Sequence, residues 1–386
     1  MEREHALKFM HDLLRLLVSK GGSDLFITAN YPPAIKCDGN LTPLSNQSLS
    51  SQHTPVLAQA VMNERQWNEF QHTHEANFAI HPMDIGRFRV NVFRQQGRVG
   101  MVLRTITTQI PDFDQLGLPP VLKDITLEKR GLVIMVGGTG SGKSTTLAAM
   151  IGYRNIHTQG HIITIEDPVE FIHEHRQCIV TQREVGVDTE SWATALKNTL
   201  RQAPDVILIG EIRDRETMDY AISFAETGHL CMATLHANSA NQALDRIINF
   251  FPEERRAQLL MDLSLNLKGL ISQRLIPKQD GKGRVAAVEV LLNSPLISDL
   301  IFKGEVHAIK EVMAKSRELG MQTFDQALFD LHQLGVIRYE DALRNADAVN
   351  DLRLRIKLEG TAPVASESVN LPNLTILSDE SDSQTP

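Results

Sequence analysis

The stretch GLVIMVGGTGSGKSTTLAAM, residues 131–150, decides the fold prediction. Its apolar first residues predict a buried strand, its glycines a tight loop and its last residues a helix. The loop matches the pattern G-x4-G-K-[ST], in which backbone N–H groups surround phosphate oxygens because glycine places no Cβ in the way. The following helix adds the positive end of its dipole. We therefore expect this loop to bind a nucleoside triphosphate, and its strand–helix context argues against a chance glycine-rich turn.

Two side chains of the loop have predicted roles of their own. Lys143 can reach the β- and γ-phosphates, and the hydroxyl of Ser144 can ligate Mg²⁺. ATP and Mg²⁺ are therefore the expected cofactors. The predicted nucleotide-binding residues are Gly137, Gly138, Thr139, Gly140, Ser141, Gly142, Lys143, Ser144 and Thr145.

Three more apolar runs each end in polar side chains. They are HIITIED (161–167), DVILIGE (205–211) and HLCMATLH (229–236). Short apolar runs that alternate with helical sequence are typical of the parallel strands of an α/β domain, buried on both faces. We expect the side chains at these strand ends to share the nucleotide chemistry.

Each strand end offers a candidate and an alternative. Glu166 can orient and deprotonate water, whereas a turn or helix-capping role suits Asp167 better. Glu211 is the candidate acid toward Mg²⁺, although Gly210 stands where this strand of a P-loop protein usually carries Asp; the alternative is a surface acid. For His236, a phosphate-sensing role and a structural role both remain open.

The remaining sequence predicts the domain organisation. Residues 1–108 read as a small α+β unit with an amphipathic first helix, a strand at DLFIT, a turn at NYPPAIKCDGN, a helical stretch near 54–71 and a hairpin within 86–106. The predicted boundaries are 1–108 for this unit, 109–120 for a linker, 121–294 for the nucleotide-binding core, 295–358 for a helical region and 359–386 for an acidic disordered tail.

Composition narrows the function classes. The formal net charge is −8, and five of the acids lie in residues 359–386, which leaves about −3 for the rest of the chain. That balance and an aromatic content of 5% argue against a nucleic-acid binder. The three cysteines form no CxxC pair, and no apolar run approaches the ~18–20 residues of a membrane span. We therefore expect a cytoplasmic protein without direct membrane insertion.

Four segments in order carry a family resemblance. GGTGSGKSTTLAAM, IITIEDPVEFIHE, APDVILIGEIRDRETM and GHLCMATLHANSANQALDRIINFFP resemble the Walker A, Asp, Walker B and His boxes of the type II/IV secretion ATPases. SDLFI, GRFRVNVF and GMQTFDQAL are similar to the type IV pilus retraction ATPases of the PilT/PilU family. LISDLIFKGE departs from the AIRNLIRE segment typical of PilT-type proteins, so the resemblance is closer to the PilU type.

The resemblance implies a fold and an activity. The fold class is α/β, with a RecA-like P-loop NTPase domain, a smaller N-terminal α+β PAS-like domain and a C-terminal helical region. The activity is that of a Mg²⁺-dependent ATPase, a homo-hexamer that powers pilus retraction and twitching motility. Its implied partners at the cytoplasmic face of the inner membrane are a PilT-like retraction ATPase, to which it is an accessory, and the pilus platform protein.

The resemblance also implies residue roles. Glu166 is the general base, and Glu211 acts with Ser144 at the Mg²⁺ and water site. His236 links the state of the γ-phosphate to domain position. Arginines of the N-terminal domain complete the nucleotide site, and the candidates are Arg89 and Arg104, for which a solvated strand position is the alternative.

Three other functions are weighed against this one. A pilus assembly or type II secretion ATPase is disfavoured because many of those proteins carry a tetracysteine zinc module and a longer N-terminal region, which this chain lacks. A RecA-like nucleic-acid translocase is disfavoured by the composition. A non-catalytic structural subunit is disfavoured because the P-loop lysine and the strand-end acids are intact.

Overall fold

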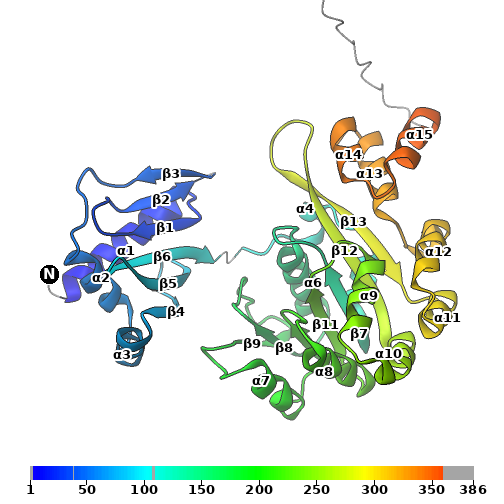
Figure 1. Ribbon diagram of the computed structural model, residues 1–386, viewed down its shortest axis with the longest axis horizontal. Helices are drawn as coiled ribbons and strands as arrows, with labels where there is room; N and C mark the ends of the chain where they lie inside the picture. Colours follow the sequence, from blue (N-terminus) through cyan, green and yellow to red (C-terminus); the bar gives the residue numbers. More distant parts are fainter. Residues whose placement is uncertain (1–2, 38, 107–108, 360–386) are drawn as a thin grey trace, which may run out of the picture. The chain divides into compact units, whose positions relative to one another are not determined.

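The N-terminal domain is built on a six-stranded sheet, ordered β3-β2-β1-β6-β5-β4 (Figure 1). The structure is a computed structural model, described here for residues 3–37, 39–106 and 109–359. The domain contains α1 (Arg3–Ser19), β1 (Asp24–Ile27), β2 (Ala34–Cys37), β3 (Asn40–Pro43), α2 (His53–Val61), α3 (Glu64–Thr73), β4 (Glu75–Ile80), β5 (Arg87–Gln95) and β6 (Arg98–Ile106).

Alternating burial builds the hairpin of β5 and β6. Phe88, Val90 and Val92 are buried in the domain core, while the polar residues between them are partly exposed. Gln96 and Gly97 have φ angles of 49° and 74°, the left-handed conformation that a two-residue hairpin turn requires. The hairpin predicted from the sequence is therefore present.

Two local predictions in this domain need correction. The helical stretch near 54–71 is two helices, because the side chain of Asn63 accepts a hydrogen bond from the backbone of Gln66 at 2.8 Å and starts α3 anew. The segment interpreted as a turn, residues 30–40, contains β2, which pairs with β1 and β3.

The central domain holds a seven-stranded sheet, ordered β13-β12-β7-β11-β10-β8-β9. From β12 to β9, each neighbouring pair is parallel. Its elements are α4 (Phe113–Leu116), α5 (Val121–Leu127), β7 (Gly131–Val136), α6 (Lys143–His157), β8 (Gly160–Glu166), β9 (Cys178–Glu184), α7 (Trp192–Thr199), β10 (Val206–Ile209), α8 (Arg215–Glu226), β11 (Leu230–Leu235), α9 (Ala240–Asn249), α10 (Glu253–Asn266), β12 (Leu267–Pro277), β13 (Arg284–Leu292), α11 (Pro295–Lys303) and α12 (Ile309–Lys315).

Strand β7 is buried on both faces and divides the central domain into two cores. Leu132, Ile134 and Val136 pack in one core with residues of α7 to α11. Val133 and Met135 point the other way and pack with residues of α4, α5 and α6. All five side chains have no exposed surface. The sheet therefore lies between two helical layers, as expected for an α/β domain.

A smaller compact unit is formed by residues 276–284 and 324–359. Inside it, the carboxylate of Asp325 accepts hydrogen bonds from the backbone N–H groups of Asp347 and Ala348, at 2.8 and 3.1 Å. Those two residues directly precede α15, so the aspartate fixes where that helix begins. The unit contains α13 (Phe324–Gln333), α14 (Tyr339–Asn345) and α15 (Val349–Glu359). The predicted acidic tail lies outside the described residues from 360 onward.

Replacing Phe88 with alanine is expected to weaken the N-terminal sheet. The side chain is fully buried, and truncating a buried phenylalanine costs about 3–5 kcal/mol. Hydrogen exchange of β1 and β6 amides should accelerate by roughly two orders of magnitude or more. Leu41→Ala is the matched control, because Leu41 is 51% exposed in the same sheet. Equal exchange in the two variants would contradict the assignment of Phe88 to the core.

Candidate functional site

A cavity of about 330 Å³ lies where the parallel strands of the central sheet end. Because β7, β8, β10 and β11 run in the same direction, their carboxyl ends bring separate segments to one edge. The lining contains the predicted loop residues 139–145 together with Glu166, Glu211 and His236. Four stretches of sequence that lie up to about a hundred residues apart therefore meet in one site.

The loop has the geometry of a phosphate cradle. Gly140 and Gly142 have φ angles of 75° and 87°, which side chains other than glycine rarely adopt. The ammonium group of Lys143 donates hydrogen bonds to the carbonyl oxygens of Gly137 and Gly138, at 2.8 and 2.9 Å. Burial lowers the pKa of this lysine, and the carboxylates of Glu211 and Glu170 oppose that shift. The lysine is thus folded back on its own loop.

Glu166 ends β8 with its carboxylate held from two sides. Its Oε1 accepts a hydrogen bond from the hydroxyl of Thr164 at 2.6 Å and another from the amide of Gln182 at 3.4 Å. Burial nevertheless raises the pKa of Glu166, since it outweighs these hydrogen bonds. A carboxylate with a raised pKa, directed into a phosphate site, is suited to accept a proton from water.

Glu211 lies between two cationic or potentially cationic partners. Its carboxylate is 2.9 Å from Nε of Arg213 and 3.4 Å from Nε2 of His236. The contact between Glu211 and His236 joins the ends of β10 and β11, which the sequence analysis connected only through the family resemblance.

Gly210 has a steric reason to be glycine. A Cβ at this position would lie 3.1 Å from the Cα of Glu166 and from the carbonyl oxygen of Ile165. The close approach of β8 and β10 therefore disfavours a side chain at this position, and the nearest acid is Glu211, one residue later.

The sequence analysis missed Arg213. Its guanidinium also lies 3.4 Å from the carboxylate of Asp167 and 5.8 Å from the ring centroid of Trp192, and all three residues line the cavity. Side-chain hydrogen bonding to Glu211 raises the pKa of Arg213. Lys143 is thus not the only cation that the chain places beside the phosphate cradle. The signal in the sequence was the position of Arg213, two residues after a strand-end acid.

The two predicted arginines of the N-terminal domain form a cross-strand pair. Arg89 on β5 is directly opposite Arg104 on β6. The guanidinium of Arg104 lies 2.7 Å from the carboxylate of Asp24, which is buried. Arg104 therefore already has an acidic partner in its own sheet.

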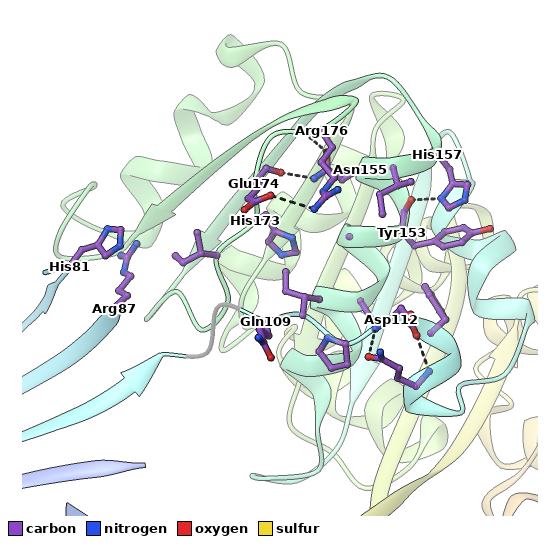
Figure 2. A pocket seen from close by; sticks show the side chains of 18 residues that line it. His81, Arg87, Gln109, Asp112, Tyr153, Asn155, His157, His173, Glu174 and Arg176 are labelled. Carbon is purple, nitrogen blue, oxygen red and sulfur yellow. Dashed lines mark hydrogen bonds and ion pairs between the residues drawn. The ribbon is translucent and has the colours of Figure 1, made fainter. Parts of the chain in front are cut away.

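A second hollow of the central domain lies near the carboxyl end of α6 (Figure 2). On this wall, the amide of Asn155 donates to the carbonyl oxygen of Glu174 at 2.7 Å and accepts from the backbone of Arg176. The ring of Tyr153 stacks on His157 at 3.9 Å. These hydrogen bonds and ring contacts are made between residues of the wall itself, so we assign this wall a structural role. The described residues contain no cluster of three or more His, Cys, Asp or Glu side chains that could hold a metal ion.

Comparison with known proteins defines the family. The model of the family described as "Type II/IV secretion system protein" matches residues 3–328. The chain belongs to this family. Its relatives include the type IV pilus ATPase PilU of Pseudomonas aeruginosa, 63% identical over 346 residues that cover 90% of this chain and 91% of the relative. The type IV pilus retraction ATPase PilT of the same organism is 42% identical, over 87% of this chain and 97% of its own.

A solved structure supports the same assignment for this secretion ATPase. The crystal structure of the pilus retraction motor PilT with bound ADP matches with a TM-score of 0.84 and 40% identity, over 89% of this chain and 98% of that one. The α/β architecture, with an N-terminal domain and a nucleotide-binding domain, is therefore confirmed. No helix within the described ranges is long and apolar enough to cross a membrane.

Gly210→Ala is expected to disturb the site of this secretion ATPase. The added Cβ must push β8 and β10 apart by a few tenths of an ångström, which changes the spacing of Glu166 and Glu211. We expect a loss of about 1–3 kcal/mol in stability and reduced phosphate release. Gly152→Ala is the control, because the nearest atom to its Cβ is 3.9 Å away. Wild-type melting and turnover in Gly210→Ala would show that the strands have room.

Proposed function

We propose that this secretion ATPase is a motor that couples ATP hydrolysis to type IV pilus retraction, as a PilU-type partner of a PilT-like motor. The observation that carries the proposal is the single cavity in which the phosphate loop, Glu166, Glu211 and His236 meet. The proposal is supported by relatives named as pilus ATPases that match this chain over about nine-tenths of its length.

The phosphate loop binds the triphosphate in this proposal. Lys143 exchanges the carbonyl oxygens of its own loop for the β- and γ-phosphates, because a charge-assisted bond to phosphate is the stronger of the two. The hydroxyl of Ser144 and the carboxylate of Glu211 are oxygen donors in the same cavity, which is the chemistry that Mg²⁺ prefers. Bound there, the ion would neutralise charge on the phosphate oxygens.

Glu166 is the proposed general base. Its carboxylate accepts the proton of the attacking water while the hydroxyl of Thr164 and the amide of Gln182 hold it in place. Its raised pKa brings the group closer to the working pH, where proton transfer is most effective.

Glu211 and His236 form the proposed sensor. The imidazole of His236 lies 3.4 Å from the carboxylate of Glu211, so a change at the Mg²⁺ side of Glu211 alters the partner of His236 directly. His236 follows β11, whose strand contacts both β7 and β10. A change in the position of the imidazole therefore acts on β11, which lies between β7 and β10 in the sheet.

Arginines complete the charge stabilisation in the proposal. The transition state spreads negative charge over the γ-phosphoryl oxygens, and preorganised cations stabilise it. Arg213 is available from the same chain. Arg89 and Arg104 are proposed to act on a nucleotide across a domain or subunit boundary, and Arg104 would first have to leave Asp24. A homo-hexameric ring, with the inner-membrane pilus platform protein as its further partner, is part of the same proposal.

Two substitutions test the enzymatic part. Lys143→Ala should abolish Mg²⁺-dependent phosphate release because nucleotide binding loses its cation. Glu166→Gln should keep ADP affinity within about threefold and lower turnover by ~10²–10⁴, since glutamine retains the size but cannot accept the proton. Nucleotide titration and steady-state rates separate the two effects. Turnover in Glu166→Gln at the wild-type rate would transfer the base role to Glu211.

A genetic measurement tests the motor part. In cells that lack their own PilU-type protein, this chain should restore retraction under load only when a PilT-like motor is present, and its Lys143→Ala variant should not. Retraction supported without any PilT-like protein would contradict the accessory role. A pull-down of the purified chain with the PilT-like protein and with the platform protein identifies which of them it contacts.

The pH dependence of turnover provides a further prediction. Because burial raises the pKa of Glu166, the base form is lost as the pH falls through that raised value, at a higher pH than for an ordinary glutamate. Thr164→Val removes a hydrogen bond that lowers this pKa, so the acid limb of kcat should move to higher pH. Thr164→Ser keeps a hydroxyl and should restore the wild-type profile. Identical limbs in all three proteins would exclude Glu166 as the titrating base.

A further inference from the structure

A buried glutamine lies directly behind the phosphate loop. Strand β12 runs parallel to β7, and the pairing places Ser272 opposite Val136, the last residue before the loop. Gln273 is therefore beside the first glycine of the loop, Gly137. Its side chain is 3% exposed and comes from a strand more than a hundred residues away in sequence.

Both ends of the Gln273 amide are engaged. Its Nε2 donates to the carbonyl oxygen of Ser141 at 2.9 Å, and its Oε1 accepts from the hydroxyl of Thr146 at 2.8 Å. A carbonyl oxygen only accepts, so the NH₂ end must face Ser141 and the oxygen end must face Thr146. The glutamine thus bridges the phosphate loop and the first turn of α6.

The bond to Ser141 sets the direction of the next backbone N–H. In a planar trans peptide, the C=O of one residue and the N–H of the next point in opposite directions. Holding the Ser141 carbonyl toward Gln273 therefore turns the N–H of Gly142 away from β12. Residues 141–143 line the cavity, and in a phosphate loop these amides are the ligands of the phosphate oxygens.

The packing of Gln273 leaves no room for a side chain at two glycines of the loop. A Cβ on Gly142 would lie 2.6 Å from Nε2 of Gln273, and Gly142 has a φ of 87°. A Cβ on Gly137 would lie 2.8 Å from the backbone oxygen of Gln273. Side chains at Gly137 and Gly142 would therefore both collide with Gln273, and glycine at these positions allows the close approach.

We propose that Gln273 is a positioning residue of the nucleotide site, which holds the Ser141–Gly142 peptide with its N–H directed at the phosphates before nucleotide arrives. The inference rests on the nucleotide-binding role of the loop. It assigns no chemistry to Gln273, whose effect reaches the ligand through the backbone of the loop. Preorganised donors bind better because less ordering remains to be done on binding.

Gln273→Met and Thr146→Val separate this role from general packing. Methionine keeps the length of the side chain but removes both hydrogen bonds. Valine at position 146 removes only the bond to Oε1 and leaves the bond between Nε2 and Ser141. We expect Gln273→Met to weaken ADP binding about tenfold or more and Thr146→Val to weaken it less than threefold. AMP, which lacks the β-phosphate, should lose little affinity in either variant.

The readouts are ADP and AMP titration, the melting temperature without nucleotide, and the split between KM and kcat for ATP. KM should rise in Gln273→Met while kcat stays within about threefold, because the bond between Thr164 and Glu166 is untouched. Wild-type ADP affinity in Gln273→Met, or an equal loss in Thr146→Val, would overturn the proposal. If Gln273→Met does not fold, Gln273→Asn keeps the amide but withdraws it from Ser141, and the same ADP loss is expected. ADP binding is measured without turnover, so a failed hydrolysis assay does not affect this test.

Discussion

Burial of β7 on both faces is the constraint on which the site depends. The strand has no exposed side chain, so its register between β11 and β12 is set by two hydrophobic cores at once. A one-residue slip would exchange Val133 and Met135 with the residues of the opposite core. The loop that follows β7 therefore leaves the sheet at a determined point. The glycines give the loop its shape, and the cores give it its position.

The charges of the cavity follow from this geometry. Glu166, Glu211 and Asp167 come from neighbouring strand ends, and the environment of Glu166 differs from that of the other two. Burial governs Glu166, whereas Glu211 and Asp167 share the guanidinium of Arg213. Burial raises the pKa of Glu166, which suits this acid to take a proton from water.

Sequence reasoning brought together residues that line one cavity where the signal is local. The phosphate loop and the strand-end residues Glu166, Glu211 and His236 lie in short motifs that also carry their structural context. It failed where the partner is distant. Gln273 reads as one of several polar residues in a strand, and only the pairing of β12 with β7 places it at the loop. The strand β2 was hidden in a segment rich in proline and glycine, where turn chemistry outweighs four residues of strand pattern.

One aromatic residue, Trp192, gives the cavity a fluorescent group. Trp192 lines the site, and the guanidinium of Arg213 lies 5.8 Å from its ring centroid. The chain has two tryptophans, and the other, Trp67, belongs to the N-terminal domain. Indole emission responds to a nearby charge, so a displacement of Arg213 is expected to change the contribution of Trp192 to the fluorescence. If nucleotide binding displaces Arg213, the emission of Trp192 would report that event without an added label.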